Sequence, residues 1–445
     1  MGAHFLGIKD MAGVCKPFAA EKLVRALKNE IGLPIHFHTH DTSGINASSI
    51  LKASEAGVDV ADGAIASMSG TTSQPNLNSI VAALNNTPRN TEVDLVALDQ
   101  VDNYFEIVRT YYGPFDSAPK SGTAQVYLHE MPGGQYTNLR EQAEAMGLGA
   151  RWPEIAQTYA DVNFAFGDIV KVTPSSKVVG DLAIFLVSHG MTVEEFKRLG
   201  PNHNVTLPNS VVDMFSGSLG EPEGGWPKDV QDVVLHGGTP KPGRPGEHLP
   251  PVDMTAAQHE LSTKIGREAT RTELMSYLMY PEVFLTFERA YDAYSDLSVV
   301  PTAEFFYGME PGNEITIVIE EGKSLITKFL TISEAHPDGT RTVFFELNGQ
   351  PREVTILDNS LKVESSQRAK ADPNNPGHVG APIPGAITSI TVGLGEGVKK
   401  GDRLLVMEAM KMQTTVYAPI DGKVQELLVQ IGNTVEAKDL LVIIA

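Results

Sequence analysis

The feature that most restricts the fold of this chain is an internal repeat near its C-terminus. Ala381-Pro382-Ile383 reappears 37 residues later as Ala418-Pro419-Ile420. Further pairs keep the same spacing: Gly385 with Gly422, Gly395 with Gly432, Val398 with Val435, Asp402 with Asp439, and Leu404 with Leu441. Each half contains β-rich runs that glycine turns interrupt, so residues 381–445 are predicted to form a flattened antiparallel β-barrel. A hairpin of the first half is expected to end near Ala409 to Met412.

Lys411 lies at the predicted tip of that hairpin, within Glu408-Ala409-Met410-Lys411-Met412. A ligase that forms an amide needs an unpaired primary amine on a rigid turn, and flanking methionines suit a docking surface. The lysine could also be an ordinary turn residue between two methionines that fill core gaps, but the repeat favours covalent attachment of a group to this lysine. The motif resembles the attachment site of biotin carrier domains. The resemblance implies biotin on Lys411 and a biotin protein ligase as partner, whereas lipoyl domains usually have an acidic residue where this chain has Met410.

The first 90 residues alternate short apolar runs with helical patterns. The expected strands are Phe5 to Ile8, Ile35 to His40 and Val58 to Ser67, and the expected helices are Pro17 to Glu30, Ala47 to Ala56 and Leu77 to Leu84. Three successive strand and helix units indicate parallel α/β structure. Three units are too few to close a TIM-type barrel, so residues 1–90 are expected to be part of a barrel within a larger polypeptide.

The remaining residues divide by pattern. Residues 91–296 are predicted to form a mostly helical extension, which the Gly- and Pro-rich stretch Gly217 to Val252 interrupts as an ordered loop or connector. In residues 297–364 the period changes to two, and Asp338-Gly339 and Asn348-Gly349 predict the turns of a small antiparallel sheet. Residues 365–380 have few apolar side chains and contain prolines, so they are predicted to be a flexible linker.

Three histidines alternate in Ile35-His36-Phe37-His38-Thr39-His40. On a strand they project from one face. At the C-terminal end of a barrel strand, His38 and His40 would converge, and two neutral imidazoles can bind Zn or Mn. His36 is interpreted as a hydrogen-bonded core residue one layer deeper, and Asp41 as a residue that orients a ligand histidine. Taken alone, the pattern is equally compatible with structural histidines.

The surroundings of these histidines resemble the carboxyltransferase domain of the pyruvate carboxylase family. His38-Thr39-His40-Asp41-Thr42 and Gly7-Ile8-Lys9-Asp10-Met11-Ala12-Gly13 carry the resemblance first. It continues through Asp62-Gly63-Ala64, His129 to Leu139 (HEMPGGQYTNL), Val172 to Asp181 (VTPSSKVVGD) and Phe305-Phe306-Tyr307-Gly308. The resemblance therefore covers nearly the entire chain. It implies that residues 297–364 are a β region of the tetramerisation or allosteric type, and that the protein is a homotetramer.

The resemblance also implies a metal site. In the family, the lysine of the Lys-Asp-Met motif is carbamylated and bridges to the metal beside two histidines, which places Lys9 with His38 and His40. A carbamate supplies a hard oxygen ligand, whereas a plain lysine would repel a cation. Without the resemblance, Lys9 could be a surface lysine or part of a salt bridge.

The family likewise assigns roles to the segment around Thr173. Its hydroxyl is implied to shuttle a proton between pyruvate and biotin, with Ser176 and Lys177 near the biotin ring. Thr173-Pro174 could otherwise simply initiate a turn. The implied reaction is carboxyl transfer from carboxybiotin to the methyl carbon of pyruvate, which gives oxaloacetate and assigns the protein to the ligases.

No glycine-rich nucleotide segment or other trace of an ATP-dependent biotin carboxylase domain occurs in the sequence. ATP, Mg²⁺ and bicarbonate would therefore act only through a domain absent from this chain, and the chain alone is expected to be incomplete. One alternative is a carboxyltransferase like the α subunit of membrane-linked oxaloacetate decarboxylase, which Gly134 to Leu139, Pro174 to Lys177 and Phe305 to Gly308 disfavour. The other is a biotinylated carrier or scaffold without activity of its own.

Charge and cysteine content narrow the partners and the compartment. The 35 basic and 55 acidic residues give a formal net charge of -20, which repels nucleic acids and anionic lipid surfaces. The longest apolar runs fall far short of the roughly 18 residues of a membrane helix. Cys15 is the single cysteine, which suits a reducing compartment. We therefore expect a cytoplasmic protein, or one of the mitochondrial matrix if its source is a eukaryote.

Overall fold

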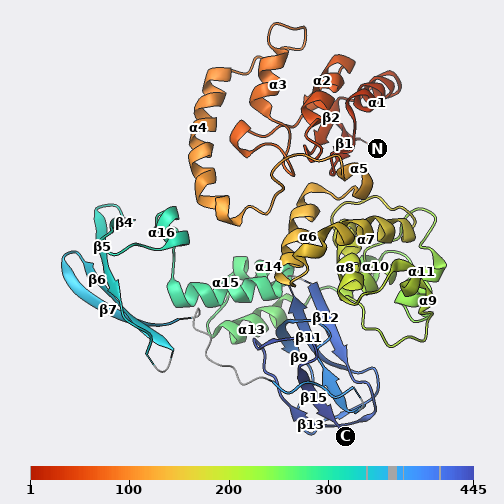
Figure 1. The fold of residues 1–445 in the computed structure, drawn as a ribbon, viewed down its shortest axis with the longest axis vertical. Helices are drawn as coiled ribbons and strands as arrows, with labels where there is room; N and C mark the ends of the chain where they lie inside the picture. The colour runs from red at the N-terminus through yellow and green to blue at the C-terminus, as the bar shows by residue number, and fades with distance from the viewer. Residues whose placement is uncertain (1, 337–338, 359–367, 374, 410–411) are drawn as a thin grey trace. The chain divides into compact units, whose positions relative to one another are not determined.

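The computed structural model describes residues 2–336, 339–358, 368–373, 375–409 and 412–445. Contacts divide the chain into two units, one formed by residues 1–247 together with 368–445 and the other by residues 248–367 (Figure 1). Among the described residues, none of the helices combines the length and the apolar character that crossing a bilayer requires.

The first unit begins with the predicted parallel α/β structure. Strands β1 (Leu6–Asp10), β2 (Ile35–Thr39) and β3 (Val60–Ala61) pair in that order, all parallel. Helices α1 (Pro17–Glu30), α2 (Asn46–Ala56) and α3 (Leu77–Leu84) follow them in turn. Proline at the first turn starts α1, and Gly57 ends α2 in the left-handed conformation. Val24, Phe37 and Ile50 bring α1, β2 and α2 into one buried cluster.

The third strand is much shorter than the expected run from Val58 to Ser67. After Ala61 the backbone N–H of Asp62 donates to Phe37 O, and the chain then leaves the sheet to form an isolated bridge between Ala64 and Asn76. A short 3-10 helix, η1 (Ala66–Met68), occupies the end of the predicted strand. The three parallel strands are thus confirmed, but this segment pairs mostly outside the sheet.

A helical segment follows, as the apolar spacing predicted. Its helices are α4 (Leu95–Tyr112), α5 (Val126–His129), α6 (Gly133–Ala145), α7 (Trp152–Ala165), α8 (Ser175–Ser188), α9 (Val193–Arg198), α10 (Asn209–Phe215), α11 (Lys228–Val234) and α12 (Pro245–His248), with 3-10 turns η2 (Gly113–Phe115) and η3 (Gly149–Arg151). The stretch expected as a loop between Gly217 and Val252 therefore contains α11 and α12. Val230, Val233 and Val234 explain α11, because they form a buried face at helical spacing.

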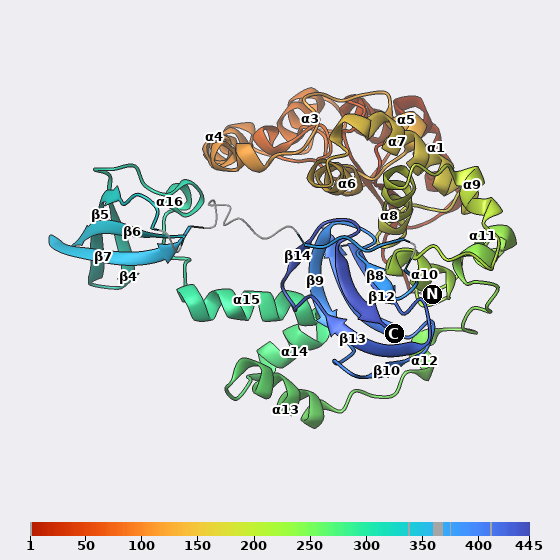
Figure 2. The same cartoon turned by 60° about the horizontal axis from the view of Figure 1, so that its bottom comes forward.

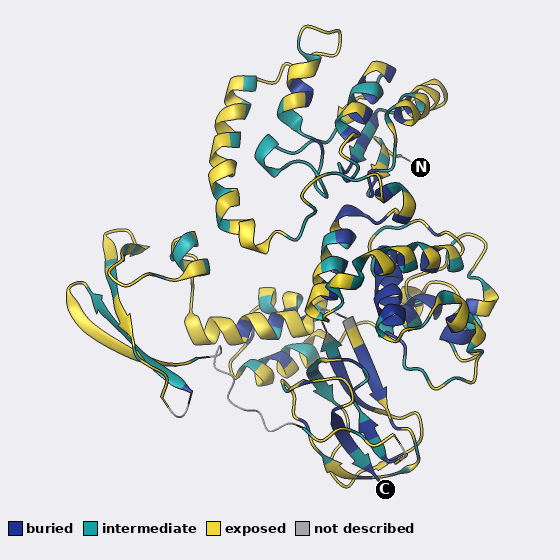
Figure 3. Ribbon diagram, viewed as in Figure 1, coloured by how far each residue is buried: buried dark blue, intermediate teal, exposed yellow. Residues whose placement is uncertain are grey.

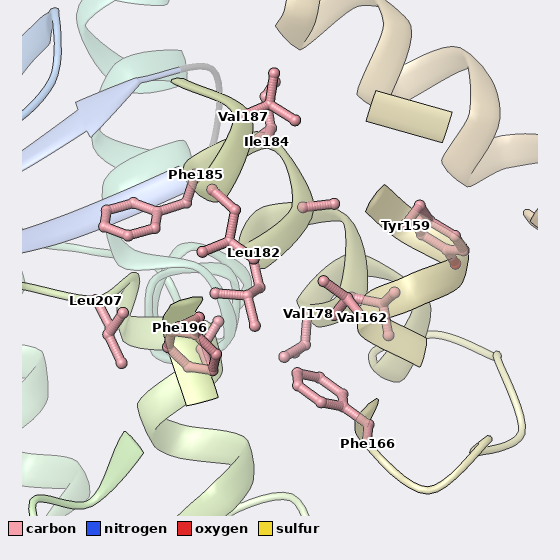
Figure 4. Close-up of a cluster of buried hydrophobic side chains, with 14 of the residues drawn as sticks. Tyr159, Val162, Phe166, Val178, Leu182, Ile184, Phe185, Val187, Phe196 and Leu207 are labelled. Atoms are coloured by element: carbon pink, nitrogen blue, oxygen red, sulfur yellow. The ribbon is translucent and has the colours of Figure 1, made fainter. Parts of the chain in front are cut away.

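Helix α8 is the centre of this segment. Every residue of α8 except Lys177 and Ser188 is buried, which Figure 3 shows as a dark blue helix. Figure 4 shows Val178 of α8 beside Val162 of α7 and Phe166, the residue that follows α7, and it shows Leu182 near Phe196 of α9. Full burial of each such side chain contributes about 1.5–3 kcal/mol. The position of α8 is consequently fixed on all sides.

The second unit contains helices and one antiparallel sheet. Its helices are α13 (Met254–Ile265), α14 (Arg271–Met279), α15 (Pro281–Tyr294) and α16 (Thr302–Tyr307), and its strands are β4 (Glu314–Glu320), β5 (Lys323–Ile332), β6 (Thr340–Leu347) and β7 (Gln350–Leu357), paired in sequence order. Asn348 and Gly349, both at positive φ, make the predicted turn between β6 and β7. Asp338 lies outside the described residues. The division by contacts groups α13 to α15 with the sheet, whereas the sequence pattern placed them with the preceding helices.

The C-terminal part of the first unit is a barrel of two four-stranded sheets (Figure 2). One has the order β12-β11-β9-β14 and the other β10-β13-β15-β8. The strands are β8 (His378–Gly380), β9 (Gly385–Ile390), β10 (Gly397–Val398), β11 (Arg403–Ala409), β12 (Met412–Tyr417), β13 (Gly422–Leu427), β14 (Thr434–Val435) and β15 (Leu440–Ile444). The starts of β9, β10 and β11 recur 37 residues later as those of β13, β14 and β15, so the repeat in the sequence is a repeat in the fold.

The segment predicted as a flexible linker, residues 365–380, differs from that expectation from Arg368 onward. The Arg368 guanidinium donates to Leu428 O and to Asn433 Oδ1, each at 2.9 Å. Lys370 forms an ion pair with Asp439 at 2.8 Å, and β8 pairs with β15. Polar side chains that have no apolar pattern along the sequence thus find partners on the barrel, so residues 368–373 and 375–380 belong to it.

Candidate metal and carboxyltransfer site

Strand β2 directs its histidines to one side, as alternation predicted. Ile35, Phe37 and Thr39 are buried on the opposite side, while His36 and His38 are half-buried. His40 follows directly after the strand and is 8% exposed. In the parallel register of β1 and β2, Lys9 is the partner of His38. The fold therefore brings Lys9, His38 and His40 to the same end of neighbouring strands.

Each of the two candidate ligand histidines has its Nδ1 atom fixed by an acceptor. His38 Nδ1 lies 2.7 Å from Asp62 Oδ2, and His40 Nδ1 lies 2.7 Å from the carbonyl oxygen of Thr72. A carbonyl oxygen can only accept a hydrogen bond, and so can an ionised carboxylate, so both rings carry their proton on Nδ1. Burial lowers the pKa of His40 below its ordinary value, which favours the neutral ring. Both Nε2 atoms then present lone pairs.

The two Nε2 atoms point to one place. They are 3.4 Å apart, and the Gln74 amide nitrogen lies 3.5 Å from His40 Nε2, at the limit of a hydrogen bond. Two nitrogens bound to one tetrahedral zinc ion at about 2.1 Å would be about 3.4 Å apart. Two unprotonated nitrogens at this separation repel each other unless a cation lies between them, so the donor set fits a divalent metal.

Two imidazoles do not complete a coordination shell. Among the described residues, no group of three or more His, Cys, Asp or Glu side chains is arranged to hold a metal ion. Lys9 would supply a further ligand only as a carbamate, because an ammonium group repels a cation. Its place beside His38 in the register is compatible with that role.

The aspartates near the histidines have different functions from those expected. Asp41 Oδ1 accepts from the backbone N–H of Asn46 at 2.9 Å, so it holds the start of α2 and does not orient a ligand histidine. That expectation was wrong, because Asp41 points toward the helix that follows the strand. Asp62, just after β3, contacts His38 and also His36, whose Nε2 lies 2.7 Å from Asp62 Oδ1. Burial raises the pKa of Asp62, but the two imidazole hydrogen bonds outweigh it and leave the pKa below its ordinary value.

His36 of β2 and Asp10 of β1 also lie near the candidate ligands. His36 is hydrogen-bonded as expected, but its side chain is 40% exposed rather than part of a core. Asp10, the neighbour of Lys9, accepts from the backbone N–H groups of Val14 and Cys15 and from the Thr39 hydroxyl. Asp10 therefore fixes the turn after β1 and joins β1 to β2. Because Asp10 has this structural role, Lys9 is the functional candidate in the Lys-Asp-Met motif.

Gly133, in the HEMPGG motif, lies against His40, and the sequence alone gave this glycine no separate role. A Cβ atom on Gly133 would lie 2.6 Å from His40 Nδ1 and 2.5 Å from Thr72 O, while one on Gly134 would meet nothing within 4 Å. The Gly133 N–H also donates to Met11 O at 2.9 Å. The start of α6 thus lies directly against the hydrogen bond that orients His40. Two adjacent glycines in the sequence gave no signal of which one makes this approach.

Thr173, Ser176 and Lys177 lie at the start of α8, with Thr173 exposed two residues before the helix begins and Ser176 buried in its first turn. Lys177 forms an ion pair with Asp181, one turn later. Asp181 is fully buried and also accepts from the Ser210 hydroxyl at 2.5 Å. Burial raises the pKa of Asp181, and the Lys177 charge opposes that shift. Within the described residues no hydrogen bond or ion pair joins these three residues to the histidines.

Lys411 lies outside the described residues. The strands around it are described: β11 and β12 pair antiparallel, and their last registered pair is Ala409 with Met412. The hairpin expected from the repeat is therefore present.

Three family models match this chain. One described as a conserved carboxylase domain matches residues 126–328, one described as a biotin-requiring enzyme matches residues 377–444, and one described as HMGL-like matches residues 1–104. The match that begins at residue 377 agrees with a C-terminal domain that starts before Ala381.

Curated relatives match along almost the whole chain. Pyruvate carboxylase of Bacillus subtilis (strain 168) is 46% identical over 440 residues, which cover 99% of this chain and 38% of that protein. Mitochondrial pyruvate carboxylase of Homo sapiens is 41% identical over 443 residues, which cover 99% of this chain and 37% of that protein. The chain thus spans less than two fifths of the length of the curated relatives it matches.

Solved structures of a pyruvate carboxylase also match this chain. A complete multifunctional pyruvate carboxylase from Rhizobium etli matches with a TM-score of 0.73 and 47% identity, covering 99% of this chain and 40% of that one. The carboxyl transferase domain of the Rhizobium etli enzyme with pyruvate and biocytin matches with a TM-score of 0.75 and 49% identity, covering 80% of this chain and 60% of that one. These likenesses support an HMGL-like, TIM-barrel-type domain and a biotinyl domain in the present chain.

Proposed function

Because this chain corresponds along 99% of its length to the C-terminal part of pyruvate carboxylases, we propose that it provides the carboxyltransferase and biotin carrier functions of such a ligase. The reaction is transfer of a carboxyl group carried by biotin to pyruvate, giving oxaloacetate. The observation that carries the proposal is the pair of Nε2 atoms 3.4 Å apart whose rings are both fixed through Nδ1. A carrier or scaffold without activity has no use for two such convergent lone pairs.

The residues divide the work as follows. His38, His40 and a carbamylated Lys9 hold a Zn or Mn ion, which when bound polarises the keto oxygen of pyruvate and makes its methyl protons acidic. The Thr173 hydroxyl accepts a proton from that methyl group and passes it toward biotin, while Ser176 and Lys177 orient the biotin ring. An uncharged relay avoids placing a second negative charge beside the developing enolate. Lys411 bears the biotin, and ATP, Mg²⁺ and bicarbonate act through a separate biotin carboxylase domain.

Metal binding tests the histidine assignment. The purified chain, loaded with ZnCl₂ or MnCl₂ and desalted, is expected to retain one ion per chain by elemental analysis. The double variant His38→Ala, His40→Ala should retain none. Stoichiometric metal in the double variant would show that these histidines are structural.

The hydroxyl of Thr173 is tested in a polypeptide that also carries the biotin carboxylase and the remaining carboxyltransferase residues. Thr173→Ala should lower oxaloacetate formation more than tenfold, which corresponds to more than about 1.4 kcal/mol of barrier, while ATP cleavage with bicarbonate persists. Thr173→Ser, which keeps the hydroxyl, should retain much more of the rate. Equal rates in the two variants would reduce Thr173 to a turn residue.

Self-association belongs to the same proposal. Ile332, Val354 and Ile356 are exposed on the sheet of the second unit, where Figure 3 shows much of the ribbon in yellow, the colour of exposed residues. Burying such apolar side chains between copies would stabilise a homotetramer. Light scattering of the purified chain should therefore give a mass above one chain, and Val354→Glu should lower it. A monomer at all concentrations would contradict this assembly. We further propose that the protein acts in the cytoplasm, or in the mitochondrial matrix if its source is a eukaryote. The human relative is named as mitochondrial.

A further inference from the structure

Asp62 contacts two histidines with one carboxylate. Its Oδ1 lies 2.7 Å from His36 Nε2 and its Oδ2 lies 2.7 Å from His38 Nδ1, so each oxygen receives one imidazole. The backbone N–H of Asp62 donates to Phe37 O, the residue between the two histidines. Main chain and side chain together therefore anchor Asp62 at one place on strand β2.

This arrangement determines which nitrogen of His38 is available. As the carboxylate accepts from Nδ1, the proton stays on Nδ1 and the lone pair stays on Nε2, which is the atom that faces His40 Nε2. His40 needs no such carboxylate, because the carbonyl of Thr72 does the same for it. The Nδ1 atoms of the two candidate ligands are thus held by different groups, a carboxylate for His38 and a backbone carbonyl for His40. Only the orientation of His38 depends on another side chain.

His36 holds the same carboxylate of Asp62 through its other oxygen. A carboxylate bound through one oxygen can rotate about its Cβ–Cγ bond, and a second hydrogen bond to the other oxygen removes that freedom. With His36 on Oδ1, the plane of the carboxylate is set so that Oδ2 faces His38. Such outer hydrogen bonds to metal ligands typically change metal affinity about 10–100-fold when they are lost.

We propose that Asp62 and His36 are positioning residues for the metal site: Asp62 fixes the Nδ1–H tautomer of His38, and His36 fixes the carboxylate of Asp62. The proposal rests on the proposed role of His38 and His40 as metal ligands. It assigns a function to the third histidine of the strand, which the carboxyl transfer itself does not use.

The first experiment measures metal affinity with MnCl₂ or ZnCl₂ in competition with a chelator. Asp62→Asn keeps the shape of the side chain, but an amide has only one acceptor oxygen and places a donor against the second histidine. A weakening of metal binding by about 10–100-fold is expected. His36→Ala should weaken binding less, and His36→Gln, whose amide can donate to Asp62, should restore it. Asp41→Asn is the matched control, since the Asp41 carboxylate accepts from the backbone N–H of Asn46 in α2 and, among the described residues, forms no hydrogen bond with either ligand histidine.

The second experiment reports on the tautomer without any metal. In ¹⁵N-histidine-labelled chain, long-range ¹H–¹⁵N spectra distinguish Nδ1–H from Nε2–H, and the His38 signals are assigned by their loss in His38→Ala. Wild-type chain should show the Nδ1–H form, and Asp62→Asn should gain the Nε2–H form, with circular dichroism unchanged.

The outcomes distinguish failure of the metal site from failure of the positioning of His38 by Asp62. If the wild-type chain binds no metal but its His38 tautomer changes in Asp62→Asn, the metal site fails and the positioning of His38 stands. If Asp62→Asn leaves both the affinity and the tautomer unchanged, Asp62 does not position His38 and the inference is overturned. Equal loss of affinity in Asp41→Asn would also overturn it, because the effect would then not depend on contact with His38.

Discussion

The chemistry of the candidate site depends on where single protons and single atoms lie. His38 and His40 can meet one cation only because Asp62 and Thr72 hold their protons on Nδ1. Alternation along the strand predicted that the histidines share a face, since that follows from local geometry. It could not predict the partner of His38, because Asp62 is 24 residues away and the whole of helix α2 lies between them in the chain.

Gly133 offers a test at this scale. Gly133→Ala would put a methyl group 2.6 Å from His40 Nδ1 and 2.5 Å from Thr72 O, well inside contact distance. His40 or α6 must then move, which breaks the hydrogen bond between His40 and Thr72. We expect metal affinity to fall at least tenfold, measured as for the positioning residues. Gly134→Ala, with open space around its new methyl group, should leave the affinity within twofold. A similar loss in both variants would point to a general effect on α6.

At the scale of elements, the sequence predicted what local pattern determines. Helix α1 and helix α3 have the bounds expected from apolar spacing and proline placement. Strand β3 was overestimated, because its continuation depends on whether a neighbouring strand accepts its hydrogen bonds, and Ala64 instead bridges to Asn76. Helix α11 was missed because glycines and prolines on both sides obscured a short buried face.

Helix α8 carries a prediction about charge in a buried element. Lys177→Met removes the cation that is paired with the fully buried Asp181, leaving the carboxylate with the Ser210 hydroxyl. Because Lys177 is partly exposed, its loss is expected to destabilise the fold by about 1–3 kcal/mol at neutral pH, below the 3–5 kcal/mol of a fully buried pair. Denaturant unfolding followed by circular dichroism measures it.

The pH dependence of this loss has a definite sign. Burial already raises the pKa of Asp181, and without Lys177 the folded-state pKa rises further above that of the unfolded chain. In the window above the ordinary Asp pKa the folded variant then binds more protons than the unfolded one, so its stability increases as the pH falls. The deficit relative to wild type should shrink on acidification. In Asp181→Asn the further change Lys177→Met should cost little at any pH, and a constant deficit would argue against the ion pair.

At the scale of the whole molecule, composition and period identified the order of the parts but not their edges. The repeat predicted the C-terminal barrel from Ala381, and the structure confirms the repeat but extends the barrel to Arg368. Residues 368–380 have little apolar character, so only the partners that Arg368 and Lys370 find just after β13 and just before β14 and β15 reveal where they belong. Such long-range polar contacts leave no periodic trace in a sequence.

The edge of this domain can be measured with two fragments. Residues 368–445 retain β8, the buried Val379 and the ion pair of Lys370 with Asp439, whereas residues 381–445 lose all three. Burial of one valine and the pairing of a strand are together expected to contribute about 2 kcal/mol, which lowers the Tm of the shorter fragment by about 10 °C in calorimetry. In the longer fragment, Asp439→Asn removes the ion pair and keeps the strand, so it should lower the Tm by less.

Biotinylation of the same fragments connects this edge to function. A biotin protein ligase should modify the longer fragment once, at Lys411, and Lys411→Arg should abolish the adduct in mass spectrometry. The shorter fragment, whose second sheet has lost an edge strand, should be modified more slowly at temperatures near its Tm, because a ligase that recognises a rigid hairpin acts only on the folded fraction. Equal Tm values and equal rates for the two fragments would return residues 368–380 to the role of a linker and place the start of the domain at Ala381.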